Sequence, residues 1–584
     1  MKVKVLGTLY EYSHNTVPNT FDYHDYLINK HIYYGIKISN INITSNNVDY
    51  LYRIKNSIYK RIMNIDDSGF MMAFILGDKS YIDKDIYKEF QNIGTAHLLA
   101  LSGMHISLLT GIIFNTLKRF KEHYKYIICM IFLLVYGFLV LFPASILRCI
   151  FFFIISSLNN VFHLEMSNLK VLFITFVFLL CIDLNYIYDT GFWFSFSSVF
   201  GILYSSSFIR GRGKAIKLSI IAFLFTLPIS LYSFYSINIL SIIYNVILIP
   251  YVSLVVYPLS LLSLLFPFLY QLFSAALNIL LFITNIFSKI NFSRIYLSFN
   301  LVEIVIYYLL LLIGIKFKNN VFIILNGLLI IIDLLVPYFD SSLYIYYLDV
   351  GQGDSSVIIL PHRKEVIMID TGGISNSDYK VSDNTITFLH SLGINSLTLV
   401  ITHGDYDHMG DATNIVNNMN VKKIIFNCGE INELEEKLLD YKHYSCIDKL
   451  DYEPNLYFLN TKVYDNENDN SNVVYMEYNG YKFLFMGDAG IEREKDIIDK
   501  YNISDIDVLK VGHHGSKTSS SIDFINRVKP KYSIISVGKN NKYGHPNKEV
   551  LKNLKSSKIY RTDKDGTIGF KINKDNIKSL IYSP

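Results

Sequence analysis

The stretch ITHGDYDHMGD, residues 401–411, carries two histidines and three aspartates directly after the apolar run LTLV. A short apolar run of this kind predicts a buried β-strand, so His403, Asp405, Asp407 and His408 stand where that strand ends. Imidazole and carboxylate groups are ligands for zinc, manganese and iron, and carboxylates also bridge two ions. The stretch therefore predicts a divalent-metal site rather than a solvated loop.

Further acidic and imidazole side chains follow other predicted strands in the C-terminal part of the chain. Asp370 follows KEVIMI, Asp488 follows YKFLFMG, and His513 and His514 follow DVLKVG. Strand ends of packed sheets meet at one edge, which brings ligands together from distant sequence. Two ions about 3.5–4 Å apart suit phosphoryl transfer, because they stabilise both the attacking and the leaving oxygen.

We predict that one or two divalent ions, Mn or Zn, bind here. The predicted metal ligands are His403, Asp405, Asp407, His408, Asp488 and His513. The predicted catalytic residues are Asp407, His514 and Lys517, of which the histidine and the lysine neutralise phosphate oxygens. Ser516, Thr518 and Ser519 either contact phosphate or are turn residues. The basic segment from Lys510 to Lys564 either steers a polyanion or is an ordinary solvated face.

The chain upstream has the composition of a membrane protein. Of its 584 residues, 51% are hydrophobic and 15% aromatic, and the mean hydropathy is +0.29. Apolar runs such as YIICMIFLLVYGFLVLF and VEIVIYYLLLLIGI approach the length that crosses a bilayer, and together they predict about ten spans. The net charge of +4 is too small to indicate nucleic-acid binding by itself. Five cysteines without CxxC spacing are expected to be reduced or buried thiols.

Basic loops predict how these spans are oriented. KRFKEHYK at 118–125, RGRGKAIK at 210–217 and KFKNN around Lys316 are rich in Lys and Arg. The positive-inside rule places all three in the cytoplasm, and the same parity places the C-terminal domain outside the cell membrane. It also places residues 1–94 outside, although they contain no signal peptide and no span. Either this polar tail crosses unaided or the natural protein begins earlier, and we expect the second.

Polar side chains inside the predicted spans are the next feature. Arg148 interrupts PASILRCIFFF, while His97, Ser102 and His105 lie in HLLALSGMH. Intramembrane charges are costly and usually face a cavity or a partner, while Ser102 and Gly103 allow close helix approach or a broken helix. We therefore predict these four residues as the channel residues. The alternatives are an arginine that extends to the membrane surface and histidines at that surface.

Longer motifs resemble a known family in both halves of the chain. HGDYDH, DTGG, GDA and HHGS resemble the metallo-β-lactamase superfamily, whose usual signature is HxHxDH, with Asp405 in place of the second histidine. No histidine precedes MGDA, where Asn470 is the nearest candidate, and this favours a harder ion such as Mn. The block 73–111 with HLLALSGMH, together with PASILRCI, LDVGQGDS and YGHP, resembles the ComEC family of competence DNA-uptake channels. The N-terminal OB-like domain of that family is shortened or lost here.

The resemblance implies a polytopic α-helical membrane domain of about ten spans followed by an αββα metallo-β-lactamase-like sandwich. The predicted boundaries are 1–94 for a reduced N-terminal segment, 95–340 for the membrane domain and 341–584 for the metal domain. The implied function is passage of single-stranded DNA across the cytoplasmic membrane in natural transformation, with a nuclease that degrades the other strand. The implied partners are single-stranded DNA, membrane lipid, a DNA receptor and a cytoplasmic helicase-like motor; oligomerisation stays open.

Two other functions remain open from the sequence. The helices could serve only to anchor a metallohydrolase that acts on a phospholipid or a small phosphodiester. Alternatively, the channel is retained and the hydrolase has decayed into a DNA-binding fold, an idea that Asp405 keeps open. A passive anchor needs no polar groups inside the membrane, so Arg148, His97 and His105 count against the first of these.

Overall fold

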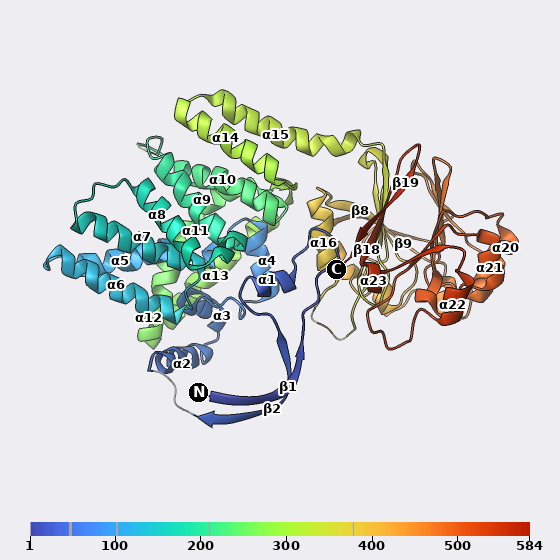
Figure 1. The fold of residues 1–584 in the computed structure, drawn as a ribbon, viewed down its shortest axis with the longest axis horizontal. Coiled ribbons are helices and arrows are strands. Elements are labelled where there is room, and N and C mark those ends of the chain that lie inside the picture. The colour runs from blue at the N-terminus through green and yellow to red at the C-terminus, as the bar shows by residue number, and fades with distance from the viewer. Residues whose placement is uncertain are drawn as a thin grey trace. The chain divides into compact units, whose positions relative to one another are not determined.

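The computed structural model describes residues 2–45, 50–100, 103–209, 211–375, 377 and 379–583. The chain forms two compact units (Figure 1). The first unit comprises Met1–Tyr12, Leu27–Ile295 and Phe299–Asn326, and the second comprises Ser13–Tyr26, Tyr296–Ser298 and Gly327–Pro584. Of the predicted functional residues, Ser102 lies outside the described residues, as does Arg210 of the second basic loop.

Residues 50–339 are built mainly from helices whose surfaces are largely apolar. Seven helices of the described residues are long and apolar enough to cross a membrane, at Ala96–Thr116, Glu122–Leu139, Ala144–Val161, Lys214–Ser233, Ser241–Leu265, Pro267–Ser288 and Asn320–Phe339, and Asn168–Ile182 is a shorter apolar helix. The expectation of several membrane-spanning helices is therefore confirmed, while the number of about ten stays a prediction. Exposed Ile, Leu, Phe and Val side chains on these helices have the character of lipid-facing surface.

Capping side chains define where several helices begin. Ser167 accepts a hydrogen bond from the Lys170 amide at the start of α8, and Asn300 and Glu303 form a capping box at the start of α14. The helices of this part of the chain are α2 (Tyr50–Met63), α3 (Ser68–Met71), α4 (Lys84–Asn92), α5 (Gly103–Thr116), α6 (Glu122–Leu139), α7 (Ala144–Val161), α8 (Asn168–Ile182), α9 (Thr190–Tyr204), α10 (Lys214–Ser233), α11 (Ser241–Tyr251), α12 (Tyr257–Leu265), α13 (Tyr270–Ser288), α14 (Leu301–Phe317) and α15 (Asn320–Phe339).

Two small sheets accompany these helices. Strands β1 (Lys2–Tyr10) and β2 (Gly35–Ser45) pair antiparallel, with most of their side chains exposed. Strands β3 (Ser236–Asn238) and β4 (Arg294–Tyr296) form the other pair. The β1–β2 ribbon is the sheet that the structure describes in the segment predicted as a reduced OB-like region.

The second unit contains two larger sheets. The eight-stranded sheet has the order β10-β9-β8-β7-β6-β5-β18-β19, and the seven-stranded sheet has the order β11-β12-β13-β14-β15-β16-β17. The strands of the first are β5 (Leu343–Tyr347), β6 (Ser356–Ile359), β7 (Val366–Ile369), β8 (Ser396–Val400), β9 (Asn420–Phe426), β10 (His443–Ser445), β18 (Thr567–Ile572) and β19 (Ile577–Tyr582). Those of the second are β11 (Lys449–Leu450), β12 (Leu456–Phe458), β13 (Val474–Tyr478), β14 (Tyr481–Phe485), β15 (Val508–Lys510), β16 (Tyr532–Ile535) and β17 (Lys558–Arg561).

Three apolar clusters order these sheets and their helices in layers. The central cluster joins the facing sides of both sheets, with Ile345 and Ile367 from one and Phe483 and Val508 from the other. A second cluster packs the other face of the first sheet against α16 (Ser382–Ser391) and α18 (Ala412–Asn418). A third packs the second sheet against α20 (Ile491–Lys500), α21 (Ile522–Val528) and α22 (Lys548–Asn553). Helices thus cover the outer face of each sheet.

A short N-terminal segment belongs to this second unit. Val17 is buried in the cluster beneath α16 and α18. The Thr16 hydroxyl donates to Asp349 at 2.6 Å, and the Asn19 amide donates to Ser391 at 3.0 Å. Residues 13–26 are therefore part of the packing of the C-terminal domain, although Thr16 and Asp349 are 333 residues apart in sequence.

Candidate metal centre

The candidate centre lies where parallel strands of both sheets end. β7 and β8 run parallel in one sheet, and β14 and β15 run parallel in the other. Asp370 follows β7, residues 402–408 follow β8, Asp488 follows β14, and His513 and His514 follow β15. Since the carboxyl ends of parallel strands meet at one edge, chain segments far apart in sequence supply one site.

Two overlapping sets of ligand side chains meet at this edge, Asp407, His408 and His514 in one and His403, His408 and Asp488 in the other. The Nε2 atom of His408 lies 3.1 Å from an oxygen of Asp488. The Nε2 atom of His514 lies 3.2 Å from Asp407 and 3.7 Å from Asp488. In a tetrahedral site with bonds of about 2.1 Å, neighbouring ligand atoms are about 3.4 Å apart. These separations fit a divalent ion held by Asp407, His408 and His514, with Asp488 beside both imidazoles.

Other groups hold the two imidazoles in this orientation. Nδ1 of His408 lies 2.7 Å from Asp370, whose carboxylate also accepts hydrogen bonds from the amide and the hydroxyl of Thr402. Nδ1 of His514 lies 3.0 Å from the carbonyl oxygen of Ser536. Both rings therefore direct Nε2 toward the centre, and Asp370 acts as an orienting carboxylate behind a ligand.

The remaining predicted ligands form a less complete set. Nε2 of His403 lies 3.4 Å from Asp405, whose side chain is 53% exposed. On the other side of His403, Nδ1 lies 3.4 Å from the hydroxyl of Ser471. Asn470, the predicted substitute for the missing histidine, directs its amide group to the backbone of Tyr464 instead. That prediction is wrong, because the Asn470 amide is taken up by the Tyr464 backbone, and the hydroxyl of its neighbour Ser471 lies behind the His403 ring.

Burial shows that this set of residues suits a cation. His403, His408, Asp488 and His514 are all buried. Within the described residues, one ring nitrogen of each histidine and one oxygen of Asp488 have no hydrogen-bond partner, although buried polar groups almost always have one. These atoms are the ones that converge, and grouped side chains of this kind can hold a metal ion. The residues thus fit the divalent ion expected from the sequence.

The carboxylates and imidazoles also perturb one another. Burial opposes ionisation of Asp488, but the neighbouring His408 and His514 outweigh it and hold the pKa of Asp488 well below its usual range. Burial likewise lowers the pKa of His514, but Asp488 and Asp354 outweigh it and raise that pKa to about 10. The carboxylates therefore keep protons on the imidazoles, which is the behaviour of a site that attracts cations.

Two participants were missed from the sequence. Asp354, in the turn between β5 and β6, accepts a hydrogen bond of 2.7 Å from Lys510, and both side chains are almost fully buried. The other oxygen of Asp354 lies 3.3 Å from Nδ1 of His514. An added Cβ at Gly353 would lie 2.4 Å from the carbonyl oxygen of Asp407, so this turn packs directly on the ligand loop. The signals were the glycines of VGQGDS and a lysine inside the apolar run DVLKVG.

The predicted residues near His514 take different positions. His513 is partly exposed, with Nε2 3.8 Å from Asp488 and Nδ1 3.1 Å from the Thr518 hydroxyl. Lys517 is exposed. The hydroxyl of Ser519 donates to the carbonyl oxygen of Gly512 at 2.7 Å, as expected of a turn residue. His513 therefore lies at the rim of the centre. Of the two roles that the sequence left open for Ser519, phosphate contact and turn residue, the structure favours the turn residue.

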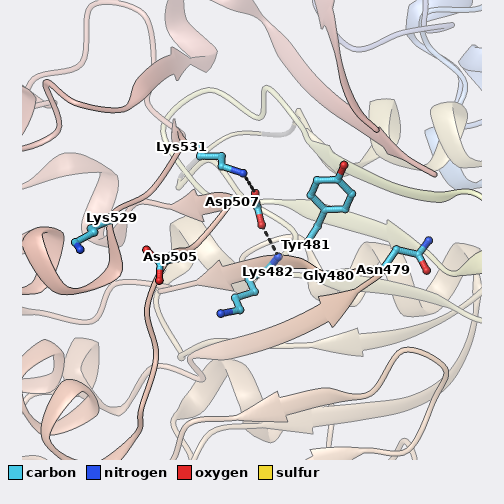
Figure 2. Close-up of a pocket in the computed structure, with 8 residues that line it drawn as sticks. All are labelled: Asn479, Gly480, Tyr481, Lys482, Asp505, Asp507, Lys529 and Lys531. Carbon is cyan, nitrogen blue, oxygen red and sulfur yellow. Dashed lines mark hydrogen bonds and ion pairs between the residues drawn. The ribbon is translucent and has the colours of Figure 1, made fainter. Parts of the chain in front are cut away.

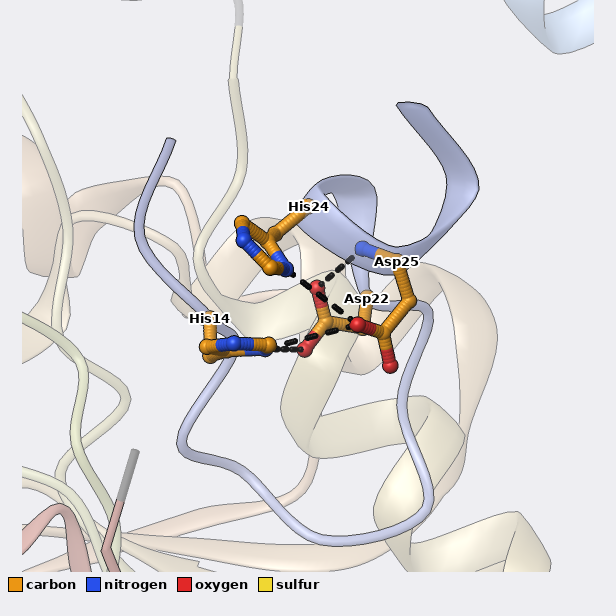
Figure 3. Close-up of side chains that lie close together, drawn as sticks. All are labelled: His14, Asp22, His24 and Asp25. Atoms are coloured by element: carbon orange, nitrogen blue, oxygen red, sulfur yellow. Dashed lines mark hydrogen bonds and ion pairs between the residues drawn. The ribbon is translucent and has the colours of Figure 1, made fainter. Parts of the chain in front are cut away.

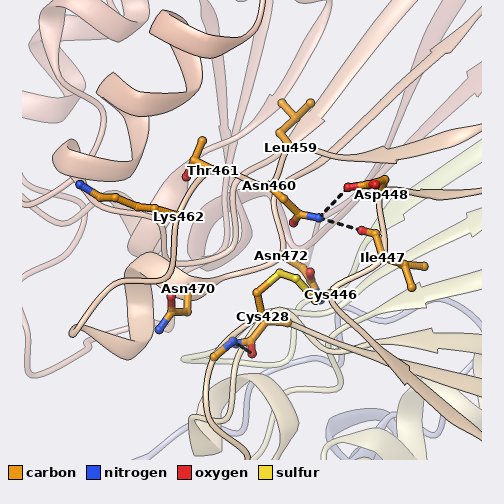
Figure 4. The surroundings of a disulfide bond; sticks show 12 residues. Cys428, Cys446, Ile447, Asp448, Leu459, Asn460, Thr461, Lys462, Asn470 and Asn472 are labelled. Atoms are coloured by element: carbon orange, nitrogen blue, oxygen red, sulfur yellow. Dashed lines mark hydrogen bonds between the residues drawn. A yellow bond between two sulfur atoms is a disulfide. The ribbon is translucent and has the colours of Figure 1, made fainter.

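Cys428 and Cys446 form a disulfide close to the site (Figure 4). The expectation of reduced or buried thiols is therefore wrong for this pair, because the parallel pairing of β9 with β10 brings the two cysteines together. Asn427, beside the disulfide, donates to Glu467 at 3.3 Å, and Gly404 donates to the same carboxylate. The disulfide thus adjoins the loop that carries His403. Cys129, Cys149 and Cys181 are free.

A cavity of about 330 Å³ lies at another edge of the second sheet (Figure 2). It is lined by residues that precede or begin β14, β15 and β16, namely Asn479, Gly480, Tyr481, Lys482, Asp505, Asp507, Lys529 and Lys531. These are the amino ends of the strands whose carboxyl ends carry the candidate ligands. The cavity is therefore separate from the candidate centre.

The predicted channel residues occupy different environments. Arg148, on α7, is buried, and its Nε donates to the Ser195 hydroxyl at 2.6 Å. His105, on α5, is also buried and lies against the ring of Tyr257, with centroids 4.3 Å apart. His97 is exposed. An added Cβ at Gly103 would lie 2.8 Å from the Arg148 guanidinium, so the start of α5 packs closely on this arginine.

Fold, site and sequence together define a class: a multi-pass membrane protein that carries a metallo-β-lactamase-type domain. Residues 348–427 and 455–539 match the metallo-beta-lactamase superfamily, and residues 74–320 match the family described as competence protein. The chain belongs to the ComEC competence family of DNA-uptake proteins, with a metallo-β-lactamase domain at its C-terminal end.

Similar proteins come from several bacteria. The chain is 28% identical to ComE operon protein 3 of Bacillus subtilis (strain 168), over 100% of this chain and 82% of that protein. It is 25% identical to competence protein ComA of Neisseria gonorrhoeae, over 88% and 76%, and 23% identical to recombination protein 2 of Haemophilus influenzae, over 89% and 72%. Among solved structures, Igni18, a metallo hydrolase of Ignicoccus hospitalis, is 14% identical over 40% of this chain and 100% of its own, with a TM-score of 0.27.

Proposed function

We propose that this protein passes single-stranded DNA across the cytoplasmic membrane during natural transformation and that its C-terminal domain hydrolyses phosphodiester bonds of the strand that is not imported. The observation that carries the enzymatic part is the grouping of Asp407, His408 and His514, with Asp488 beside both imidazoles. A decayed site would not be expected to keep three ligand groups within 4.8 Å of one another and a buried carboxylate beside them. Family membership supports the transport part.

Each side chain has a role in this proposal. A bound divalent ion would supply a Lewis acid and lower the pKa of water. Asp407, His408 and His514 would hold it, with Asp488 beside both imidazoles, and Asp370 keeps the His408 ring oriented. Asp407, 35% exposed, borders solvent and is placed to accept a proton from the attacking water. Substrate phosphate approaches from the same open side, where His513 and Lys517 offer positive charge to its oxygens.

The number and kind of metal ions follow the unequal ligand sets. Asp407, His408 and His514, with Asp488 beside them, form the first set, whereas His403, Asp405 and the shared Asp488 offer a second ion one imidazole and two carboxylates. Oxygen-rich ligation favours a harder ion, so we propose Mn²⁺ over Zn²⁺ at the second position. The αββα arrangement and the about ten spans of the family also remain part of this proposal.

Two features favour an extracytoplasmic position for the C-terminal domain. Disulfides persist in oxidising compartments and are rare in the cytosol, and this domain contains one between Cys428 and Cys446. The basic loops around Lys118 and Lys316 agree, because the positive-inside rule assigns them to the cytoplasm. The proposed partners are single-stranded DNA and lipid, with a DNA receptor outside and a helicase-like motor inside.

The test uses the full-length protein in lipid nanodiscs, since residues 13–26 complete the packing of the metal domain. Labelled single-stranded DNA is incubated with Mn²⁺ or Zn²⁺, using wild type, Asp407→Asn and, as a matched control, Asp405→Asn. We expect metal-dependent cleavage that falls at least 100-fold in Asp407→Asn and less in Asp405→Asn. Absence of cleavage in folded wild type with either ion would refute the nuclease. Turnover of phospholipid or a small phosphodiester instead would favour a membrane-anchored hydrolase.

A further inference from the structure

A second group of metal-ligand side chains lies in the N-terminal segment, apart from the metallo-β-lactamase motifs. His14, Asp22, His24 and Asp25 come together within twelve positions of sequence, and their ligand atoms all lie within 4.8 Å of one another (Figure 3). The two imidazoles are neighbours, with ring centroids 3.8 Å apart and planes at 52°. Both direct the same atom, Nδ1, at the pair of carboxylates.

The separations fit a tetrahedral ion. Nδ1 of His14 lies 2.9 Å from Asp22 and 3.6 Å from Asp25, and Nδ1 of His24 lies 3.2 Å from Asp25. Bonds of about 2.1 Å to a tetrahedral zinc ion place neighbouring ligand atoms about 3.4 Å apart. Simple histidine–aspartate pairing would need one carboxylate for each ring, whereas here the His14 nitrogen faces two.

The electrostatics and accessibility of the cluster suit a cation. Burial opposes ionisation of Asp22, but hydrogen bonds from the His14 side chain and from the backbone of Asp25 and Asn15 outweigh it and lower its pKa. Asp22 is therefore an ionised carboxylate near neutral pH. The side chains of His14 and Asp25 are 43% and 63% exposed, which leaves an open path for an ion from solvent.

The cluster is attached firmly to the C-terminal domain. Between its first and second members, Val17 is buried in the domain core, and Thr16 donates to Asp349 at 2.6 Å. The backbone amide of Thr567 also donates to the carbonyl oxygen of Thr16. An ion that joined His14 to residues 22–25 would close the loop around these contacts and hold the segment against the domain.

We propose that His14, Asp22, His24 and Asp25 bind one divalent transition-metal ion, with zinc as the best chemical match, and that this ion fastens the N-terminal segment to the C-terminal domain. Two imidazoles and two carboxylates satisfy the four-coordinate preference of zinc without any other part of the chain. The site is structural, because it lies outside the candidate hydrolytic centre and uses none of its residues.

The experiment measures binding of Co²⁺, a coloured substitute for zinc, to full-length protein in detergent after treatment with chelator. The background variant His408→Ala/Asp488→Asn removes the other centre. In this background we expect one tight equivalent of Co²⁺ with the strong visible absorption of tetrahedral coordination. Adding His14→Ala/His24→Ala should weaken that binding at least 100-fold. Adding His31→Ala, which removes a histidine paired with the single carboxylate of Asp183 at 3.2 Å, should not.

Limited proteolysis supplies an independent measurement on otherwise wild-type protein. Zinc should slow tryptic cleavage at Lys30 at least fivefold, and the substitution His14→Ala/His24→Ala should abolish this effect of zinc while leaving the His31→Ala variant protected. Absence of a tight Co²⁺ equivalent in the folded background variant would overturn the proposal. So would zinc protection that persists without His14 and His24.

Discussion

The buried ion pair beside the candidate centre leads to a quantitative prediction. Lys510 and Asp354 are 2.7 Å apart, with side chains only 3% and 6% exposed. Replacing Lys510 by methionine keeps a side chain of similar length, but the buried Asp354 carboxylate loses the ammonium group that neutralises it. Breaking a buried pair by removing one partner costs about 3–5 kcal/mol. For a unit of this size that loss corresponds to a fall in Tm of about 10 °C.

The chain contains a matched control. Lys531 makes the same 2.7 Å contact with a buried carboxylate, Asp507, but its own side chain is 68% exposed (Figure 2). The Asp507 carboxylate also keeps a hydrogen bond from the Lys482 amide. Since water replaces an exposed ammonium group, Lys531→Met should cost less than about 1 kcal/mol.

The assay is calorimetric unfolding of the full-length protein in chelator, so that metal binding does not contribute to stability. Lys510→Met, Asp354→Asn and the double variant complete a thermodynamic cycle. We expect the double variant to lose less unfolding free energy than the two single variants lose together. The difference should be at least about 1 kcal/mol, because the double variant removes both charges. Equal losses in Lys510→Met and Lys531→Met, or strict additivity in the cycle, would refute the reasoning.

Four further predictions concern other parts of the chain. Asp370→Asn should weaken Mn²⁺ affinity about 10- to 100-fold, because a ligand imidazole loses its orienting carboxylate; competition with a coloured chelator measures this, and unchanged affinity would count against it. Burial raises the pKa of Glu494 to about 7 from 4.5, so the native state holds the extra proton between these values. The free energy of unfolding should therefore fall by up to about 3 kcal/mol as pH rises from 4.5 through 7. In Glu494→Gln, the unfolding free energy from denaturant titrations should decrease less steeply with pH than in wild type. Alkylation of unfolded, unreduced protein from cells should label three of the five cysteines, since Cys428 is in a disulfide; five labelled thiols would contradict an oxidising compartment. Arg148→Leu should lower DNA import at least tenfold at unchanged membrane abundance, whereas normal import would argue against a channel role.

Sequence periodicity predicted the ligand positions because strand ends are visible in it. His403, Asp407 and His408 follow an apolar run, as do Asp488 and His514, and parallel strands bring such ends to one edge. Asp354 escaped prediction because it comes from a turn between antiparallel strands, and its proximity depends on close packing of glycine on the ligand loop. Whether a residue beside a ligand faces the site depends on local dihedrals, which composition does not specify.

Neighbouring pairs illustrate this limit. His513 and His514 both have positive φ, and only the second is buried among the carboxylates. Asn470 and Ser471 are adjacent, and a short 3₁₀ turn directs the asparagine amide to the backbone of Tyr464. Two residues that are adjacent in sequence can therefore differ in whether the side chain faces the candidate centre. Sequence spacing can therefore identify the strand end that supplies a ligand, but not always the residue.

The proposed topology follows from contacts within one unit as well as from loop charge. Thr16 and Val17 pack on the C-terminal domain, so segment and domain lie on the same side of any membrane that the intervening helices cross. The number of crossings between them must then be even. Seven helices of the described residues are long and apolar enough to span. If all seven cross, an odd number of other helices crosses as well, and the shorter apolar helix α8 (Asn168–Ile182) is the first candidate. In the topology that we propose, the disulfide in the same unit favours the oxidising exterior as that shared side.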